Sequence, residues 1–213
     1  MHIPDGILPA YICAAGYAAS APVAWYSIRK IKQAGDPREN IPKAAMLTAA
    51  FFVVSWIHIP LPPTSVHLVL NGLLGAVLGY YAFPAIIIGL FFQAVMFQHG
   101  GLTTLGVNAI IIGVPALLAY YVFQLRGLRG FNERLKTGVF GFLAAFVAIG
   151  ASVALFMAFL IPNIPATLDV SAERVAIFTL SLSHVPLMVI EGTFTALVTV
   201  FLHRVRPKLL VNA

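Results

Sequence analysis

The sequence predicts an all-α membrane protein, a polytopic bundle of about seven transmembrane helices that forms a single domain over residues 1–213. Two observations support this fold class. Only 9% of the residues are charged, against roughly 25% in ordinary soluble domains. In addition, the 82 residues from Ala44 to Leu125 contain no Asp, Glu, Lys or Arg. Water cannot solvate a folded surface of that composition, whereas the hydrocarbon of a bilayer requires it.

Seven apolar runs lie between polar or Gly/Pro-rich segments, and most approach the roughly 20 residues that cross a hydrocarbon layer. The predicted helices are Leu8–Ile28, Ala44–Trp56, Ser65–Tyr81, Pro84–Phe97, Leu105–Leu125, Gly138–Ile161 and Ala176–Leu202. The second and the fourth are short. If the third and the fourth merge, the bundle has six helices instead of seven.

The basic residues predict how the bundle is oriented. Twelve of the thirteen Lys and Arg residues fall in three connecting segments, with five in 29–43, four in 126–136 and three in 204–208. Cytosolic loops carry such an excess of Lys and Arg, so we expect the N-terminus outside and the C-terminus in the cytosol. Short basic loops facing an anionic leaflet also explain the net charge of +6 without nucleic acid as a partner.

The first residues predict a metal-binding segment. The chain opens with Met1-His2-Ile3-Pro4-Asp5 and has no basic residue before Arg29, so we do not expect a cleaved signal peptide. A free amine on Met1, the amide nitrogen of His2 and its imidazole can close two fused chelate rings with three nitrogens in one plane. A fourth nitrogen would complete a square, which is typical of Ni(II) or Cu(II). We therefore expect residues 1–7 to bind a metal and to cap the bundle.

The histidines supply candidates for that fourth nitrogen. Five of the six fall on the predicted outer side, namely His2, His58, His67, His99 and His184. His58, His67 and His99 are all candidates, and each could equally be an ordinary buried or interfacial histidine. We expect His67 just inside the third helix. His99 opens a glycine-rich turn that runs to Asn108, and we expect these two residues to order the loop rather than to bind metal directly.

Two other functions remain open from the residues alone. His67, His99 and His184 could hold a catalytic metal in a membrane-embedded enzyme, with Asp5 or Glu191 as the base. His184 and Glu191, seven residues apart on one helix face, could instead form a proton-coupled carrier. Such carriers usually show inverted repeats, which the sequence lacks. It also lacks the nucleotide-binding loop G-x-x-x-x-G-K-[ST], so we do not expect ATP hydrolysis by this chain.

Several motifs point to a known family. They are Met1-His2-Ile3-Pro4-Asp5-Gly6, Ser65-Val66-His67 followed by Gly72, Phe97-Gln98-His99-Gly100-Gly101, and the run from Thr103 to Asn108. Together they resemble the NikM/CbiM family, the membrane substrate-binding subunits of nickel and cobalt energy-coupling-factor (ECF) transporters, and NikM most of all. The resemblance runs through most of the chain.

The resemblance implies a seven-helix, non-enzymatic subunit of the cell membrane that binds Ni(II), or alternatively Co(II), as a transported substrate and not as a catalytic cofactor. It implies that the ligands are the Met1 amine, the His2 amide and imidazole, and His67, with Ser65 supporting them. It further implies a transmembrane coupling subunit, cytosolic ATPase subunits and a small accessory membrane subunit as separate partner chains.

Overall fold

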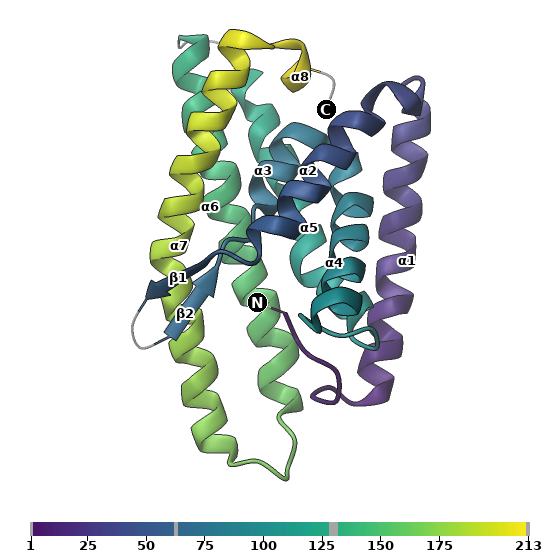
Figure 1. Ribbon diagram of the computed structural model, residues 1–213, viewed down its shortest axis with the longest axis vertical. Coiled ribbons are helices and arrows are strands. Elements are labelled where there is room, and N and C mark those ends of the chain that lie inside the picture. Colours follow the sequence, from purple (N-terminus) through teal and green to yellow (C-terminus); the bar gives the residue numbers. More distant parts are fainter. Residues whose placement is uncertain (1, 62–63, 128–131, 212–213) are drawn as a thin grey trace.

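The computed structural model describes residues 2–61, 64–127 and 132–211 and shows a bundle of long helices (Figure 1). The main helices are α1 (Ala10–Gln33), α2 (Ile41–Val54), α3 (Asn71–Leu78), α4 (Ala82–Phe97), α5 (Leu105–Gln124), α6 (Glu133–Leu160) and α7 (Val170–Val205). A short helix α8 (Lys208–Val211) and two strands, β1 (His58–Leu61) and β2 (Thr64–His67), complete the described elements. The predicted bundle of seven helices is confirmed.

Four stretches of the described chain are long and apolar enough to cross a membrane. They are Asn71–Phe97, Leu105–Gly127, Glu133–Asn163 and Val170–Val205. The first joins α3 to α4 through a short 3-10 turn, Gly79–Tyr81. The segments on either side of this stretch meet at His67 and His99, so α3 and α4 run in opposite directions and the third and fourth predicted helices remain two separate helices. Helix α1 and the short α2 lie beside them. These stretches agree with a multi-pass membrane protein.

The third predicted helix, Ser65–Tyr81, is wrong in its first part. Its opening residues lie in β2, which pairs antiparallel with β1 so that His58 stands opposite His67. The helix itself begins only at Asn71. The local sequence explains the difference: the prolines at positions 60, 62 and 63 disfavour a helix, and β-branched residues such as Val66 favour an extended chain. Apart from this hairpin, the all-α prediction holds for the described residues.

Helix α3 is buried along its whole length, and α5 and α6 pack against it. Close contact between α1 and α5 depends on glycine. A Cβ added at Gly106 would lie 2.4 Å from the backbone nitrogen of Tyr17, and one added at Gly16 would lie 2.4 Å from Val107 Cγ2. Small residues at such crossings let helix backbones touch, as in other membrane bundles.

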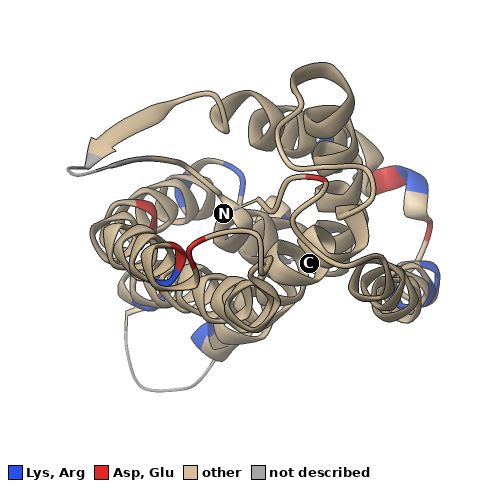
Figure 2. Ribbon diagram, turned by 90° about the horizontal axis from the view of Figure 1, so that it is seen from below, with Lys and Arg blue, Asp and Glu red and all other residues tan. Residues whose placement is uncertain are grey.

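The two ends of the bundle differ. The connections that follow α1, α5 and α7 carry the basic residues and lie at one end, at the top of Figure 1 with α8. The hairpin, residues 98–104 between α4 and α5, and the connection between α6 and α7 lie toward the other end. The described N-terminal segment runs down to the start of α1 (Figure 1) and lies between helices in the view of Figure 2. The His2 side chain is half-buried, and its Nε2 is fully covered by the protein.

Candidate metal centre

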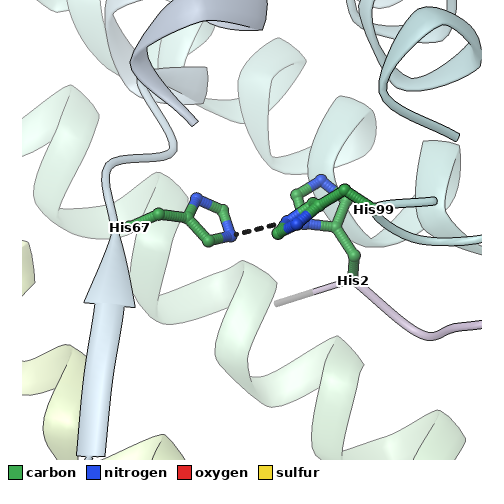
Figure 3. Close-up of side chains that lie close together, drawn as sticks. All are labelled: His2, His67 and His99. Carbon is green, nitrogen blue, oxygen red and sulfur yellow. Dashed lines mark hydrogen bonds between the residues drawn. The ribbon is translucent and has the colours of Figure 1, made fainter. Parts of the chain in front are cut away.

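Three histidines from distant parts of the sequence meet inside the bundle. His2 lies in the N-terminal segment, His67 at the end of β2, and His99 in the turn after α4 (Figure 3). His99 Nε2 is 2.9 Å from His2 Nδ1 and 3.3 Å from His67 Nε2. One ring nitrogen from each residue lies within 4.8 Å of the others. We call these three residues the histidine cluster, and imidazole nitrogens at such distances suit a transition-metal ion.

The rings of the cluster are held in their neutral form. Burial lowers the pKa of His2 well below the ordinary value for histidine, and it lowers the pKa of His67 to about 2. Burial also lowers the pKa of His99. A neutral imidazole offers a nitrogen lone pair, whereas a protonated one does not. The cluster can therefore bind a cation at neutral pH without first losing protons from its rings.

Helix α5 anchors the segment that carries His2. The Ile3 N–H donates to Asn108 Oδ1 at 2.9 Å, and Asn108 Nδ2 donates to the Ile3 carbonyl at 3.0 Å. The Thr104 hydroxyl donates to the same carbonyl at 2.7 Å. The Ile3 side chain is fully buried. The backbone beside His2 is thus fixed by three hydrogen bonds to side chains of another element.

Asp5 holds the same segment to the start of α5. Its carboxylate accepts the backbone N–H groups of Leu102, Thr103 and Thr104 at 3.1, 2.9 and 3.4 Å. The Thr103 hydroxyl also donates to it, and these hydrogen bonds, led by that hydroxyl, lower the pKa of Asp5. A carboxylate at a helix N-terminus is favoured by the helix dipole. A Cβ added at Gly101 would lie 2.0 Å from the carboxylate oxygen, so this approach requires glycine.

Sequence reasoning missed this role of Asp5. The residue was considered only as a possible base for an enzyme, whereas the structure uses it to hold the turn before α5, 98 residues away in sequence. The available signal was the pair Thr103-Thr104 just before the apolar run of α5, which is typical of a helix start.

The backbone orients the ring of His67. His67 Nδ1 lies 2.9 Å from the carbonyl oxygen of Leu68. Since a carbonyl can only accept, Nδ1 carries the hydrogen of the neutral ring and Nε2 carries the lone pair. Nε2 is the nitrogen that faces the cluster (Figure 3). Metal-binding histidines in proteins commonly donate their other ring nitrogen to a carbonyl in this way.

Other predicted candidates lie outside the cluster. His58 stays exposed, with its ring centroid 6.1 Å from that of His67 and its Nδ1 3.0 Å from the Trp56 carbonyl oxygen. His184 donates from Nδ1 to the Leu180 carbonyl, one turn back on its own helix, at 2.7 Å. A metal centre built from His67, His99 and His184, as the enzyme hypothesis required, is therefore not what the described residues form.

The structure does not describe two of the predicted site residues completely, and it places a third, Glu191, away from His184. Met1 lies outside the described residues, and so does the side chain of Ser65, whose backbone forms part of β2. Glu191, the other carboxylate of the carrier hypothesis, is fully buried and accepts hydrogen bonds from the backbone of Val69 and Leu70 rather than from His184.

Comparison with known proteins agrees with a metal-transport role. The family model CbiM, the cobalt uptake substrate-specific transmembrane region, matches residues 2–209. The chain belongs to the CbiM family. A relative from Haemophilus influenzae whose name refers to metal transport is 30% identical over 99% of this chain and 97% of its own length. The fused nickel transport protein NikMN of Rhodobacter capsulatus is 34% identical over 60% of this chain and 38% of its own length.

Solved structures share the fold. A crystal structure of a truncated transition metal transporter superimposes with a TM-score of 0.76 at 24% identity, covering 96% of this chain and 99% of that one. As a CbiM family member, the chain is a multi-pass membrane component of cobalt or nickel transport and not an enzyme. The enzyme hypothesis is thereby excluded.

Proposed function

We propose that this CbiM family chain is the substrate-binding subunit of an ECF-type importer, and that its cargo is Ni(II). The observation that carries the proposal is the direction of the His2 ring. A chelate built from the terminal amine and the residue-2 amide closes its six-membered ring through Nδ1 of His2. That nitrogen is the one that faces His99, 2.9 Å from its Nε2.

The proposed ligands are four nitrogens. They are the Met1 amine, the His2 amide, His2 Nδ1 and His67 Nε2, with His99 and Asn108 ordering the surrounding loop and N-terminal segment. A planar set of four nitrogens favours Ni(II), and Co(II) is the alternative cargo within the family. We place the histidine cluster on the outer side of the membrane, because the basic connections at the opposite end of the bundle suit the cytosol.

The proposal includes partner chains that supply the energy. Since the sequence has no nucleotide-binding loop, we propose that cytosolic ATPase subunits drive import through a transmembrane coupling subunit. A small accessory membrane subunit completes the proposed complex.

An extension of several Gly and Ser residues before Met1 tests the function directly. The extended chain keeps every side chain but moves the free amine several residues away from His2, so the fused terminal chelate can no longer form. We expect the unextended protein to hold one nickel ion per chain by elemental analysis, and the extended protein to hold none while keeping its thermal unfolding temperature. A chain extended by the same residues after Ala213 is the matched control. Stoichiometric nickel in the folded, N-terminally extended protein would refute the amine as a ligand.

The spectrum of the loaded protein tests the geometry separately. A planar set of four nitrogens should give a yellow, diamagnetic nickel complex. A paramagnetic, octahedral spectrum would indicate oxygen and water ligands and would contradict the proposed site.

A further inference from the structure

Glu191 is a fully buried carboxylate in the middle of α7 that contacts the segment next to His67. Its two oxygens each accept one backbone N–H, Oε1 from Val69 and Oε2 from Leu70, the latter at 2.8 Å. These amides belong to the connection between β2 and α3. The first hydrogen bond of α3 runs from the Leu74 N–H to the Leu70 carbonyl, so neither amide is taken by the helix.

One peptide unit connects Glu191 to the His67 ring. The N–H of Val69 and the C=O of Leu68 belong to the same planar peptide group. In a trans peptide these two groups point in opposite directions. The N–H side donates to Glu191, and the C=O side accepts the Nδ1–H of His67 at 2.9 Å. Any rotation of this peptide plane would break both hydrogen bonds together.

The hydrogen bond from the Leu70 N–H to Glu191 holds the bend between β2 and α3. Leu70 has a φ of 52°, in the left-handed region that branched and bulky residues adopt only when their surroundings impose it. Its N–H donates to the other carboxylate oxygen, so Glu191 holds two consecutive peptide groups at the point where the chain turns from the strand into α3.

We propose that Glu191 is a positioning residue for the metal ligand His67, acting through the Leu68–Val69 peptide group. Each oxygen of the Glu191 carboxyl group accepts one of two consecutive N–H groups, and hydrogen bonds in a chain reinforce one another. Glu191 therefore fixes the carbonyl that holds His67 Nδ1–H, and this keeps the Nε2 lone pair directed into the histidine cluster. The inference rests on the proposed function in so far as His67 is a metal ligand.

A role limited to holding the bundle together makes different predictions. It would lower the unfolding temperature when Glu191 is replaced, but it would leave the protonated nitrogen of His67 and the metal affinity of the folded protein unchanged. Two measurements therefore distinguish the roles. One is the tautomer of His67, and the other is the nickel affinity of variants that change Glu191 and His67 singly and together.

Glu191→Gln is the test variant, because it keeps the size of the side chain but leaves one oxygen for two N–H donors. Thr195→Val is the matched control, since Thr195 is also fully buried, lies one turn further along α7, and carries no hydrogen bond to residues 68–70 among those described. Nitrogen NMR of histidine-labelled, metal-free protein reports which ring nitrogen carries the hydrogen. We expect Nδ1–H for His67 in the wild type and in Thr195→Val, and a mixture of tautomers in Glu191→Gln. An unchanged tautomer in folded Glu191→Gln would overturn the proposal.

Nickel affinity gives the second measurement. Loss of a group that supports a metal ligand typically weakens binding about 10- to 100-fold, and we expect this loss for Glu191→Gln and none for Thr195→Val. In the double variant with His67→Ala, the Glu191 substitution should cause no further loss, because its effect passes through His67. Additive losses would show that Glu191 acts elsewhere and would overturn the proposal.

Two further outcomes are decisive. If Glu191→Gln does not fold, the wild type alone still tests the inference: His67 must be the Nδ1–H tautomer and the Val69 amide must be protected from hydrogen exchange, and failure of either overturns it. If the wild type binds no nickel or cobalt while the tautomer still responds to Glu191→Gln, the proposed function fails but the positioning of the His67 ring by Glu191 stands.

Discussion

Replacement of Asn108 by alanine should weaken metal binding without touching any proposed ligand. The Asn108 side chain is almost completely buried and bonds to both backbone groups of Ile3, the residue next to His2. Asn108→Ala removes both hydrogen bonds. The Ile3 carbonyl keeps the hydroxyl of Thr104 as a partner, whereas the Ile3 N–H loses its acceptor.

The size of the effect follows from these contacts. A buried hydrogen bond contributes about 1 kcal/mol net, and a buried donor left without an acceptor costs about 1–3 kcal/mol. The docked N-terminal segment should therefore lose about 2–3 kcal/mol. A segment that undocks must dock again when metal binds, so the loss appears in the affinity, where it corresponds to roughly a 30- to 150-fold increase in Kd at most.

Chelator competition on purified protein measures this change. Asn132→Ala is the matched control, because Asn132 caps the start of α6 at the opposite end of the bundle and its loss should lower stability but not metal affinity. Unchanged nickel affinity in Asn108→Ala, together with a clear fall in Asn132→Ala, would refute the idea that docking of the first residues limits binding.

Further predictions concern the cluster itself. His67→Ala should remove the fourth nitrogen and weaken nickel binding strongly, His99→Ala should weaken it less and His203→Ala should leave it unchanged. A larger loss in His99→Ala than in His67→Ala, in parallel titrations, would move the fourth nitrogen to His99. Asp5→Ala should lower both metal affinity and the unfolding temperature, because three N–H groups of residues 102–104 lose their acceptor. Acidification should release nickel, measured by dialysis against buffers of falling pH. Burial already holds the pKa of the His2 and His67 rings low, so protons should compete for the amine and the amide first; release that instead followed the ordinary titration of histidine would contradict this.

The helical bundle was predictable because surfaces that face lipid require an apolar, uncharged composition. The absence of charge from Ala44 to Leu125 required a membrane fold, and the helix bounds were correct within a few residues for α4 and α5. The hairpin was not predictable by the same reasoning. Short apolar runs do not distinguish a buried strand from a helix by periodicity, so Ser65–His67 was assigned to the helix that follows it.

The metal site was only partly predictable, because some of its supporting contacts involve backbone groups that all residues share. Chelate chemistry identifies His2 from its position in the chain, and topology places His67 and His99 on the same side of the bundle. The parts played by Asp5 and Glu191 depend on backbone N–H groups 97 to 122 residues away. Every residue except proline carries the same N–H group, so the sequence does not indicate which loop a given carboxylate will bind.

The backbone near each of the three histidines is held by a side chain from another element, which only the structure shows. Each lies within three residues of backbone fixed by a side chain from another element: Asn108 holds the chain beside His2, Glu191 holds it beside His67, and Asp5 holds it beside His99. Two of these side chains are carboxylates whose oxygens are occupied by backbone N–H groups. These carboxylates are therefore engaged with backbone donors, and the side-chain atoms that meet in the cluster are nitrogens. This arrangement favours a metal that prefers nitrogen to oxygen ligands, and it lets the protein order its ligands before the metal arrives.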